Sequence, residues 1–461
     1  MCHFLSNIVR EPHKNLYRYM ILSIIILASI FRIALYGDPA LSIAGNDTST
    51  YIKSAEAPLF SSEMMTGRRL LTTNLLYKVF KPRDGYQILI NGSISTTRRG
   101  IQPGFTNIVI TQLIFSLIGW GLLAFYISEN IKHPFMKILS ATVIILFAFT
   151  PQMADWDSIL MSESFTFSLF ALQFALLTKL AFLVHKDPSS NIPTYLIFWA
   201  IIFFLWTFLR DTNLFASLIT IVMISCLLFS IKYRSSKKLH GVLVFLTTIL
   251  VLGLITSSHS TRSLIQIINI YNDDLLGSPV SVSTLKELGM PAPKSEDYQA
   301  WFQENSTKTL IKFMLIHPGY PTMKIIRDFP NAFTEIKQTY FNAPEYAQAR
   351  EQLMTLGDAL HPENTTPVFL DFLLLAGLLL LALKNTTEAS RPWAWLGIWL
   401  LLTASITLIP TILGDTWALN RHALFSTMIF RFFMWVFSII MMDIALERNP
   451  PQNKLNTPQE A

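Results

Sequence analysis

Four acidic residues lie beside apolar segments of the chain, where a carboxylate could take a proton from a hydroxyl group or bind the hydroxyls of a substrate. Asp47 occurs in GNDTSTYIKSAE, four residues before Tyr51, which would place both side chains on one face of a helix. Asp155, Asp157 and Glu163 follow one another in PQMADWDSILMSESF. Structural roles compete with chemistry here: Asp47 and Asp157 could cap helices, and Glu163 could hydrogen-bond a neighbouring helix.

Basic residues occur at comparable places. Arg210 ends an apolar segment in FLWTFLRDTNLFA, and Arg421 and His422 precede the last apolar segment in DTWALNRHALF. Arg68 and Arg69 lie in SSEMMTGRRLLTTNLLYKVF. Guanidinium groups bind carboxylates and phosphates through paired hydrogen bonds, so these residues suit an anion held at membrane level. A surface ion pair with the aspartate that follows it is the competing role for Arg210.

Two further arginines lie within apolar segments, where an ionisable side chain costs about 2.5–3.5 kcal/mol and needs a reason to be there. Arg32 is near the end of the first segment, and we expect its side chain to extend to the membrane surface. Arg431 lies about 15 Å beyond Arg421 along one helix. At that depth its side chain could not extend to the membrane surface. We expect Arg431 to pair with an inward-facing acid such as Glu163.

The elements that position these groups are membrane helices, because the composition excludes a soluble protein. Of 461 residues, 51% are hydrophobic and 14% are charged, whereas soluble proteins carry roughly 25% charged residues. With 34 Phe and 10 Trp to bury, no soluble fold could cover its surface with polar groups. The basic residues behind the net charge of +6 lie largely between apolar segments. This placement is better explained by membrane topology than by nucleic-acid binding.

About ten segments reach the length of roughly 20 apolar residues that a hydrocarbon core requires. They are residues 17–36, 108–127, 138–150, 160–184, 192–209, 213–231, 242–256, 368–383, 393–413 and 423–445. A cleaved signal peptide is the competing explanation of the first segment, which is long for that role. Basic residues accumulate in alternate short connections and at both ends, which predicts that both termini are cytoplasmic.

The chain divides into four regions. We predict an N-terminal transmembrane module of about seven spans at 1–256, which includes an outer loop at 37–107, an outer loop region at 257–367, C-terminal spans at 368–446 and a cytoplasmic tail at 447–461. Apolar residues at helical spacing predict amphipathic juxtamembrane helices in SSEMMTGRRLLTTNLLYKVF, where Leu70 and its neighbours would enter the interface, and in LIKFMLIHPGYPTMKIIRDF. The predicted fold class is therefore an all-α polytopic membrane protein with two large outer loops.

Four short motifs in this layout resemble the glycosyltransferase C superfamily, which includes protein O-mannosyltransferases and bacterial aminoarabinose transferases. They are GNDTSTY with Asp47, SILMSESFTFSLFAL with Glu163, FLRDTNLFA with Arg210, and NRH with Arg421. Two departures are visible. Many members have two adjacent acids where this chain has Asp47 and Thr48, and His422 stands where a tyrosine is usual.

The resemblance implies a GT-C-like fold in a bacterial inner membrane and transfer of a sugar from a polyprenyl-phosphate donor to a glycan, lipid or protein acceptor on the periplasmic side. Such a displacement needs a base for the acceptor hydroxyl and cations for the departing phosphate. The expected base is Asp47. The expected substrate-handling residues are Glu163, Asp157, Asp155 and Tyr51 for sugar or acceptor, and Arg210, Arg421 and His422 for the phosphate, with Arg68 and Arg69 as further candidates.

Three other functions remain open at this point. A ligase or polymerase with a lipid-diphosphate donor would use the same cations, whereas a lipid or sugar transporter predicts charges on both sides of the midplane. A non-catalytic anchoring protein would tolerate Asp47→Asn. No His, Cys, Asp or Glu spacing indicates a metal site, so no cofactor is expected, although a divalent cation between the outer carboxylates stays open.

Overall fold

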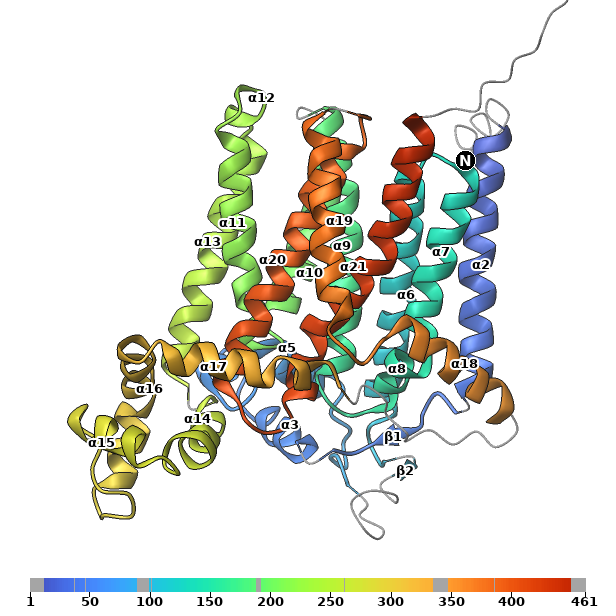
Figure 1. Ribbon diagram of the computed structural model, residues 1–461. Helices are drawn as coiled ribbons and strands as arrows, with labels where there is room; N and C mark the ends of the chain where they lie inside the picture. Colours follow the sequence, from blue (N-terminus) through green and yellow to red (C-terminus); the bar gives the residue numbers. More distant parts are fainter. Residues whose placement is uncertain are drawn as a thin grey trace, which may run out of the picture.

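The long helices run side by side in one bundle, as the computed structural model shows (Figure 1). The structure describes residues 12–36, 38–45, 47–88, 99–100, 102–187, 192–260, 262–334, 347–384 and 386–448. Within these ranges the bundle consists of α2 (Pro12–Tyr36), α6 (Thr106–Asn130), α7 (Pro134–Phe149), α9 (Glu163–Lys186), α10 (Pro193–Thr207), α11 (Leu214–Leu228), α13 (Lys237–Ser258), α19 (Thr366–Leu383), α20 (Ser390–Gly414) and α21 (Leu419–Arg448).

These helices match the predicted spans one for one. Eight of them, within the described ranges, are long and apolar enough to cross a membrane. A ninth span forms if α7 is joined to the short helices that follow it, α8 (Pro151–Ala154) and η1 (Asp155–Ser158), across a bend of 53°. The apolar α10 is shorter, at 15 residues. The prediction of an all-α polytopic membrane protein is therefore confirmed.

The two ends of the bundle differ. The beginning of α2 and the end of α21 lie at one end, and the long connections gather at the other (Figure 1). If the chain crosses the membrane an even number of times, the start of its first span and the end of its last span must lie on the same side, as they do here. The assignment of the first end to the cytoplasm stays a prediction from the basic residues.

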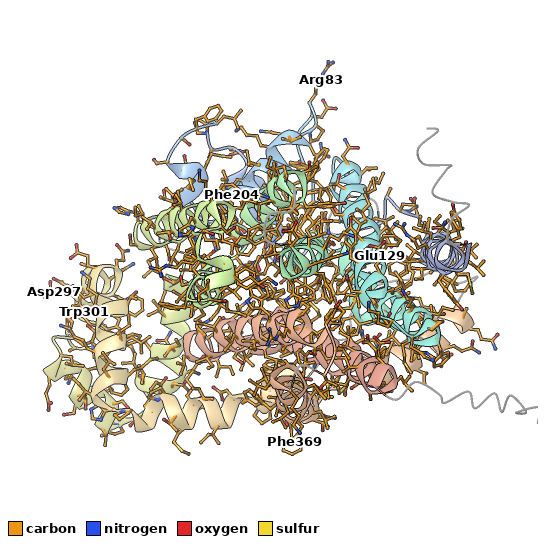
Figure 2. All side chains as sticks on the ribbon, turned by 90° about the horizontal axis from the view of Figure 1, so that it is seen from above. Arg83, Glu129, Phe204, Asp297, Trp301 and Phe369 are labelled. Atoms are coloured by element: carbon orange, nitrogen blue, oxygen red, sulfur yellow. The ribbon has the colours of Figure 1, made fainter. Side chains whose placement is uncertain are left out.

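Close helix packing builds the core at the centre of the bundle. Gly119 of α6 faces the Ser168 carbonyl of α9, and a Cβ atom at Gly119 would lie 2.5 Å from that oxygen. Phe174 stacks on Trp399 of α20 with ring centroids 5.7 Å apart. The outer helices expose apolar side chains instead, such as Phe369 of α19, which points outward in Figure 2. This distribution suits a lipid environment, where the exterior is as apolar as the core.

The first outer segment packs onto the bundle. It contains α3 (Thr48–Ser54), α4 (Glu63–Thr66), α5 (Leu71–Val79) and two short strands, β1 (Ser42–Ile43) and β2 (Arg99–Gly100), which pair antiparallel with Ser42 opposite Gly100. Leu70 was expected to enter the membrane interface, but it is 6% exposed and belongs to the protein core. The reason is that α5 packs against α3 and α10. Val79 at the end of α5 does remain exposed.

The second outer segment forms a small helical subdomain in its first half and packs against the bundle in its second half. It comprises α14 (Leu264–Ile270), the π-helix η3 (Tyr271–Leu275), α15 (Pro279–Glu287), α16 (Tyr298–Ile316), α17 (Gly319–Asp328), η4 (Pro330–Phe333) and α18 (Ala347–Leu360). A small core around Tyr271, Leu285 and Phe313 holds α14 to α16 together. Asp297 and Trp301 lie at its outer edge, away from the bundle (Figure 2). The amphipathic α17 crosses the end of the bundle and exposes Met323 and Ile326 (Figure 1).

Candidate active site

Asp47 sits where the chain leaves β1 and enters α3. It occupies the cap position of that helix, but its side chain accepts no capping hydrogen bond. The carboxylate faces two arginines instead: Oδ1 lies 3.0 Å from Nη2 of Arg69, and Oδ2 lies 3.0 Å from Nη2 of Arg421. The competing role of Asp47 as a side-chain cap is therefore not the one that the structure shows.

The charge on Asp47 is stabilised by these neighbours. Partial burial opposes ionisation, but the guanidinium groups of Arg69 and Arg421 outweigh it and lower the pKa of Asp47 below its usual value. The side chain retains 31% of its exposure, so a substrate can reach it. Asp47 is therefore an ionised, accessible carboxylate. An anion that bound the two arginines in its place would raise the pKa of Asp47.

Glu163 begins α9 and lies behind Asp47. Its Oε1 is 3.8 Å from Nε of Arg421 and 3.4 Å from Nη2 of Arg210. The side chain is only 2% exposed, and Oε2 has no hydrogen-bond partner among the described residues. Arg210 itself is fixed at the turn between α10 and the short helix η2 (Asp211–Asn213). Its expected alternative partner, Asp211, pairs with Arg262 instead.

These contacts form one continuous arrangement of alternating charge, which we name the charge cluster: Arg69, Asp47, Arg421, Glu163 and Arg210. Its members come from the α4–α5 loop, the start of α3, the start of α21, the start of α9 and the α10–η2 turn. All of these lie at the end of the bundle that carries the long connections (Figure 1). The cluster has three guanidinium groups and two carboxylates, so it carries one positive charge in excess.

His422 extends the cluster through Arg421. Its Nε2 lies 3.1 Å from Nη2 of Arg421, and its Nδ1 hydrogen-bonds Asp415 in the α20–α21 loop. Because the guanidinium can only donate, a neutral His422 accepts at Nε2 and donates from Nδ1 to Asp415. Backbone N–H groups of Thr416 and Trp417 also donate to Asp415, at 2.8 and 3.0 Å. Asp415 thus orients His422 and was not among the predicted residues.

The ring of Tyr51 packs against the guanidinium group of Arg69. The guanidinium carbon of Arg69 lies 4.1 Å from the centre of the Tyr51 ring, and the Tyr51 hydroxyl lies 3.3 Å from Oγ of Ser162. Burial raises the pKa of Tyr51, so its hydroxyl keeps its proton. Arg69 also donates from Nε to Oγ1 of Thr50 at 2.8 Å. Its neighbour Arg68 is exposed and forms no ion pair with another described residue.

Asp155 and Asp157 lie in a separate group of charges. Asp155 accepts two hydrogen bonds from Nη2 of Arg350 in α18, at 2.7 and 2.9 Å, and Asp157 forms an ion pair with Arg32 of α2. Ser164 adds a hydrogen bond to Asp157 at 2.5 Å. The structure therefore does not bring Asp155 and Asp157 together with Asp47. Their expected part in substrate handling stays a prediction.

Both deep arginines differ from expectation. Arg32 does not extend to the membrane surface: it is 3% exposed and meets Asp157 and Ser116 inside the bundle. The expected pair of Arg431 with Glu163 is wrong. Arg431 donates to the carbonyl of Phe333 at 2.8 Å, to that of Pro362 at 2.9 Å and to Oγ1 of Thr427 at 2.9 Å. It ties outer backbone segments to α21.

A polar cleft of about 600 Å³ opens between η3, α17, η4 and the α20–α21 loop. Asn420, the residue before Arg421, lies in its wall. The opposite wall carries Asp273, whose Oδ2 accepts hydrogen bonds from Thr416 and Trp417, both at 2.8 Å. The α20–α21 loop therefore holds Asp273 in the cleft wall and also carries Asp415. In the described ranges no three His, Cys, Asp or Glu side chains are grouped as a metal site would require.

No protein-family model and no curated protein matches this chain. Among solved structures, it is similar to the archaeal oligosaccharyltransferase AglB from Archaeoglobus fulgidus in complex with an inhibitory peptide and a dolichol-phosphate, at 13% identity and a TM-score of 0.46. The match covers 93% of this chain and 51% of that one, so this chain spans about half the length of the archaeal structure.

Proposed function

We propose that the protein is a membrane glycosyltransferase that moves a sugar from a polyprenyl-phosphate donor to an acceptor hydroxyl at the end of the bundle with the long connections. The observation that carries this proposal is the charge cluster, in which an accessible carboxylate and three guanidinium groups meet at the end of a membrane bundle. The elements that carry these five residues all lie at that end of the bundle (Figure 1).

The phosphate of the donor would bind Arg421 and Arg210. Both guanidinium groups are oriented by the buried Glu163, whose own exposure is too small for contact with a large substrate. Arg421 is 31% exposed on its side chain, and His422 stands beside it. Phosphate oxygens accept paired hydrogen bonds from guanidinium in the same way as a carboxylate does. Glu163 is thus proposed as a positioning residue for the phosphate-binding arginines.

Asp47 would act as the general base. The acceptor oxygen forms a bond to the anomeric carbon while the bond from that carbon to the phosphate oxygen breaks. The bonding electron pair leaves with the phosphate, and the acceptor proton passes to Asp47. A phosphate that engages Arg421 weakens the ion pair with Asp47 and raises the basicity of that carboxylate when the donor is in place. Inversion at the anomeric carbon follows from a single displacement.

The acceptor would approach through the polar cleft beside Asn420. Its walls carry carboxylates and amides, which suit the hydroxyl groups of a glycan better than an apolar peptide or acyl chain. Asp155 and Asp157 would stand outside this path, because both are buried in a separate group of charges with Arg350 and Arg32, whereas Asp47 is exposed.

Lipid analysis tests this function. Membranes of a strain that lacks the gene should accumulate a polyprenyl-phosphate sugar and lose one residue from an envelope glycan, as detected by mass spectrometry. Reintroduced wild-type protein should reverse both changes. An unchanged lipid pool and glycan in the deletion strain would contradict the proposal. Accumulation of a diphosphate-linked sugar would assign the protein to the ligase or polymerase class instead.

A further inference from the structure

A second cavity lies at the end of the bundle away from the charge cluster. It holds about 300 Å³ between the ends of α9, α10, α11, α13 and α20. Leu177 marks its deep side, 14 residues along α9 from Glu163, which places it about 21 Å from the start of that helix. The cavity is therefore separate from the proposed donor and acceptor sites.

Its walls are apolar and its rim is basic. The walls include Leu180, Trp199, Ile224, Leu239 and Trp395. The rim carries His185, Lys232, Lys238 and Arg391. This volume is within the range of small-molecule sites, about 300–1,000 Å³. An apolar chain with an anionic end would match such a distribution.

The four basic rim residues come from four different helices. Lys232 belongs to the short helix α12 (Ile231–Arg234), where its Nζ donates to the carbonyl of His185 and lies 5.3 Å from the Tyr233 ring centre. Arg391, in the first turn of α20, is exposed and forms no ion pair with the described residues. Glu388, exposed just before α20, interacts electrostatically with His185. The rim keeps an excess of positive charge.

We propose that this cavity binds an anionic phospholipid, with one acyl chain between the helices and the phosphate against Lys232 and Arg391. Basic pockets between transmembrane helices bind the phosphates of anionic lipids, and basic residues near a membrane surface attract them. The tail of the polyprenyl donor is the competing occupant. It would leave the basic rim without an anion, since the donor phosphate must reach Arg421 at the other end.

The test uses the full-length protein, purified in detergent and titrated with phosphatidylglycerol or phosphatidylcholine of identical acyl chains, with bound lipid counted by native mass spectrometry. One phosphatidylglycerol should bind about tenfold more tightly than phosphatidylcholine. The double variant Lys232→Gln/Arg391→Gln should lose this preference. The double variant Lys186→Gln/Arg234→Gln removes the same charge from exposed residues at the same end, outside the cavity wall, and should keep it.

A variant with Ile224→Trp fills the apolar part of the cavity and should lower the occupancy of both lipids. If that variant does not fold, the two charge variants still decide the matter. Equal binding of the two phospholipids, or equal losses in both double variants, would overturn the proposal. Polyprenyl phosphate that displaces phosphatidylglycerol from the wild type, but does not bind the Lys232→Gln/Arg391→Gln variant, would assign the cavity to the donor lipid and overturn it as well.

Discussion

Arg421 lies 3.0 Å from Asp47 although 374 residues separate them in the sequence. Asp47 follows the first span and Arg421 begins the last one, so the contact joins the two ends of the chain's path through the membrane. The same guanidinium reaches toward Glu163 at 3.8 Å. One arginine thus sets the position of the proposed base relative to the proposed phosphate site.

Asp47→Asn should reduce sugar transfer about 10²–10⁴-fold, because an amide cannot take the acceptor proton. The substitution preserves side-chain size and removes one partner of Arg69 and Arg421, which are themselves partly exposed, so folding should be retained. Transfer is measured in reconstituted membranes as release of polyprenyl phosphate.

The matched control for Asp47→Asn is Arg68→Gln, an exposed charge change in the same outer segment that should leave transfer near the wild-type rate. Full activity of Asp47→Asn, at equal protein level in the membrane, would remove Asp47 from the reaction.

Arg421→Ala should raise the donor KM at least about tenfold and change the acceptor KM much less, because a hydrogen bond to a charged group contributes about 1.5–3 kcal/mol. Arg421→Lys should recover only part of this loss, since an ammonium group cannot make the paired contact of a guanidinium. Initial rates over a grid of donor and acceptor concentrations separate the two constants. A selective rise in the acceptor KM would show that Arg421 does not hold the phosphate.

The spans and the core of the site were predictable because both are local in the sequence. Ten apolar segments specify ten helices. Glu163, Arg210 and Arg421 each stand at or next to the end of one, and Asp47 lies in the first outer segment, all on the side of the long connections. Residues at helix ends on one side of a bundle are brought to a common level by topology alone. Their exact pairing was not predictable, since the choice of Arg69 over Arg68 depends on the stack on Tyr51.

Partners supplied by the outer segments were missed or misassigned. Arg350 reaches Asp155 from α18, 195 residues away, and nothing in the local sequence of either residue indicates the other. Arg431 binds backbone carbonyls of the loop before α19 and of η4, and carbonyl positions have no sequence signature. Asp415 had one local signal, its position seven residues before His422, which lies in the first turn of the following helix α21.

Asp157→Asn should destabilise the fold by about 3–5 kcal/mol, because it leaves the Arg32 guanidinium buried without its carboxylate. The double variant Arg32→Met/Asp157→Leu should be more stable than the sum of the two single variants predicts, since it removes both charges. Thermal unfolding in detergent, analysed as a double-mutant cycle, measures the coupling. Loss of transfer by folded Asp157→Asn at unchanged stability would instead restore Asp157 to the substrate site.

His361 should make the fold sensitive to acid. It is buried against Phe147, whose carbonyl lies 2.9 Å from its Nε2, and burial together with the charge of Arg431 lowers the pKa of His361 from 6.5 to about 3. The unfolded chain therefore binds a proton that the folded protein excludes. Stability is fully present above pH 6.5 and falls by about 1.4 kcal/mol per pH unit as the pH drops from there toward 3.

The variant His361→Gln tests this linkage, because glutamine can still donate to the Phe147 carbonyl but binds no proton in this range. Its unfolding temperature should vary less with pH between 6.5 and 4 than that of the wild type, even if it is lower at pH 7.5. The exposed His259 provides the matched control, and His259→Gln should leave the wild-type slope unchanged. Identical slopes for His361→Gln and the wild type would show that the folded protein does not exclude the proton from His361, and would contradict this linkage.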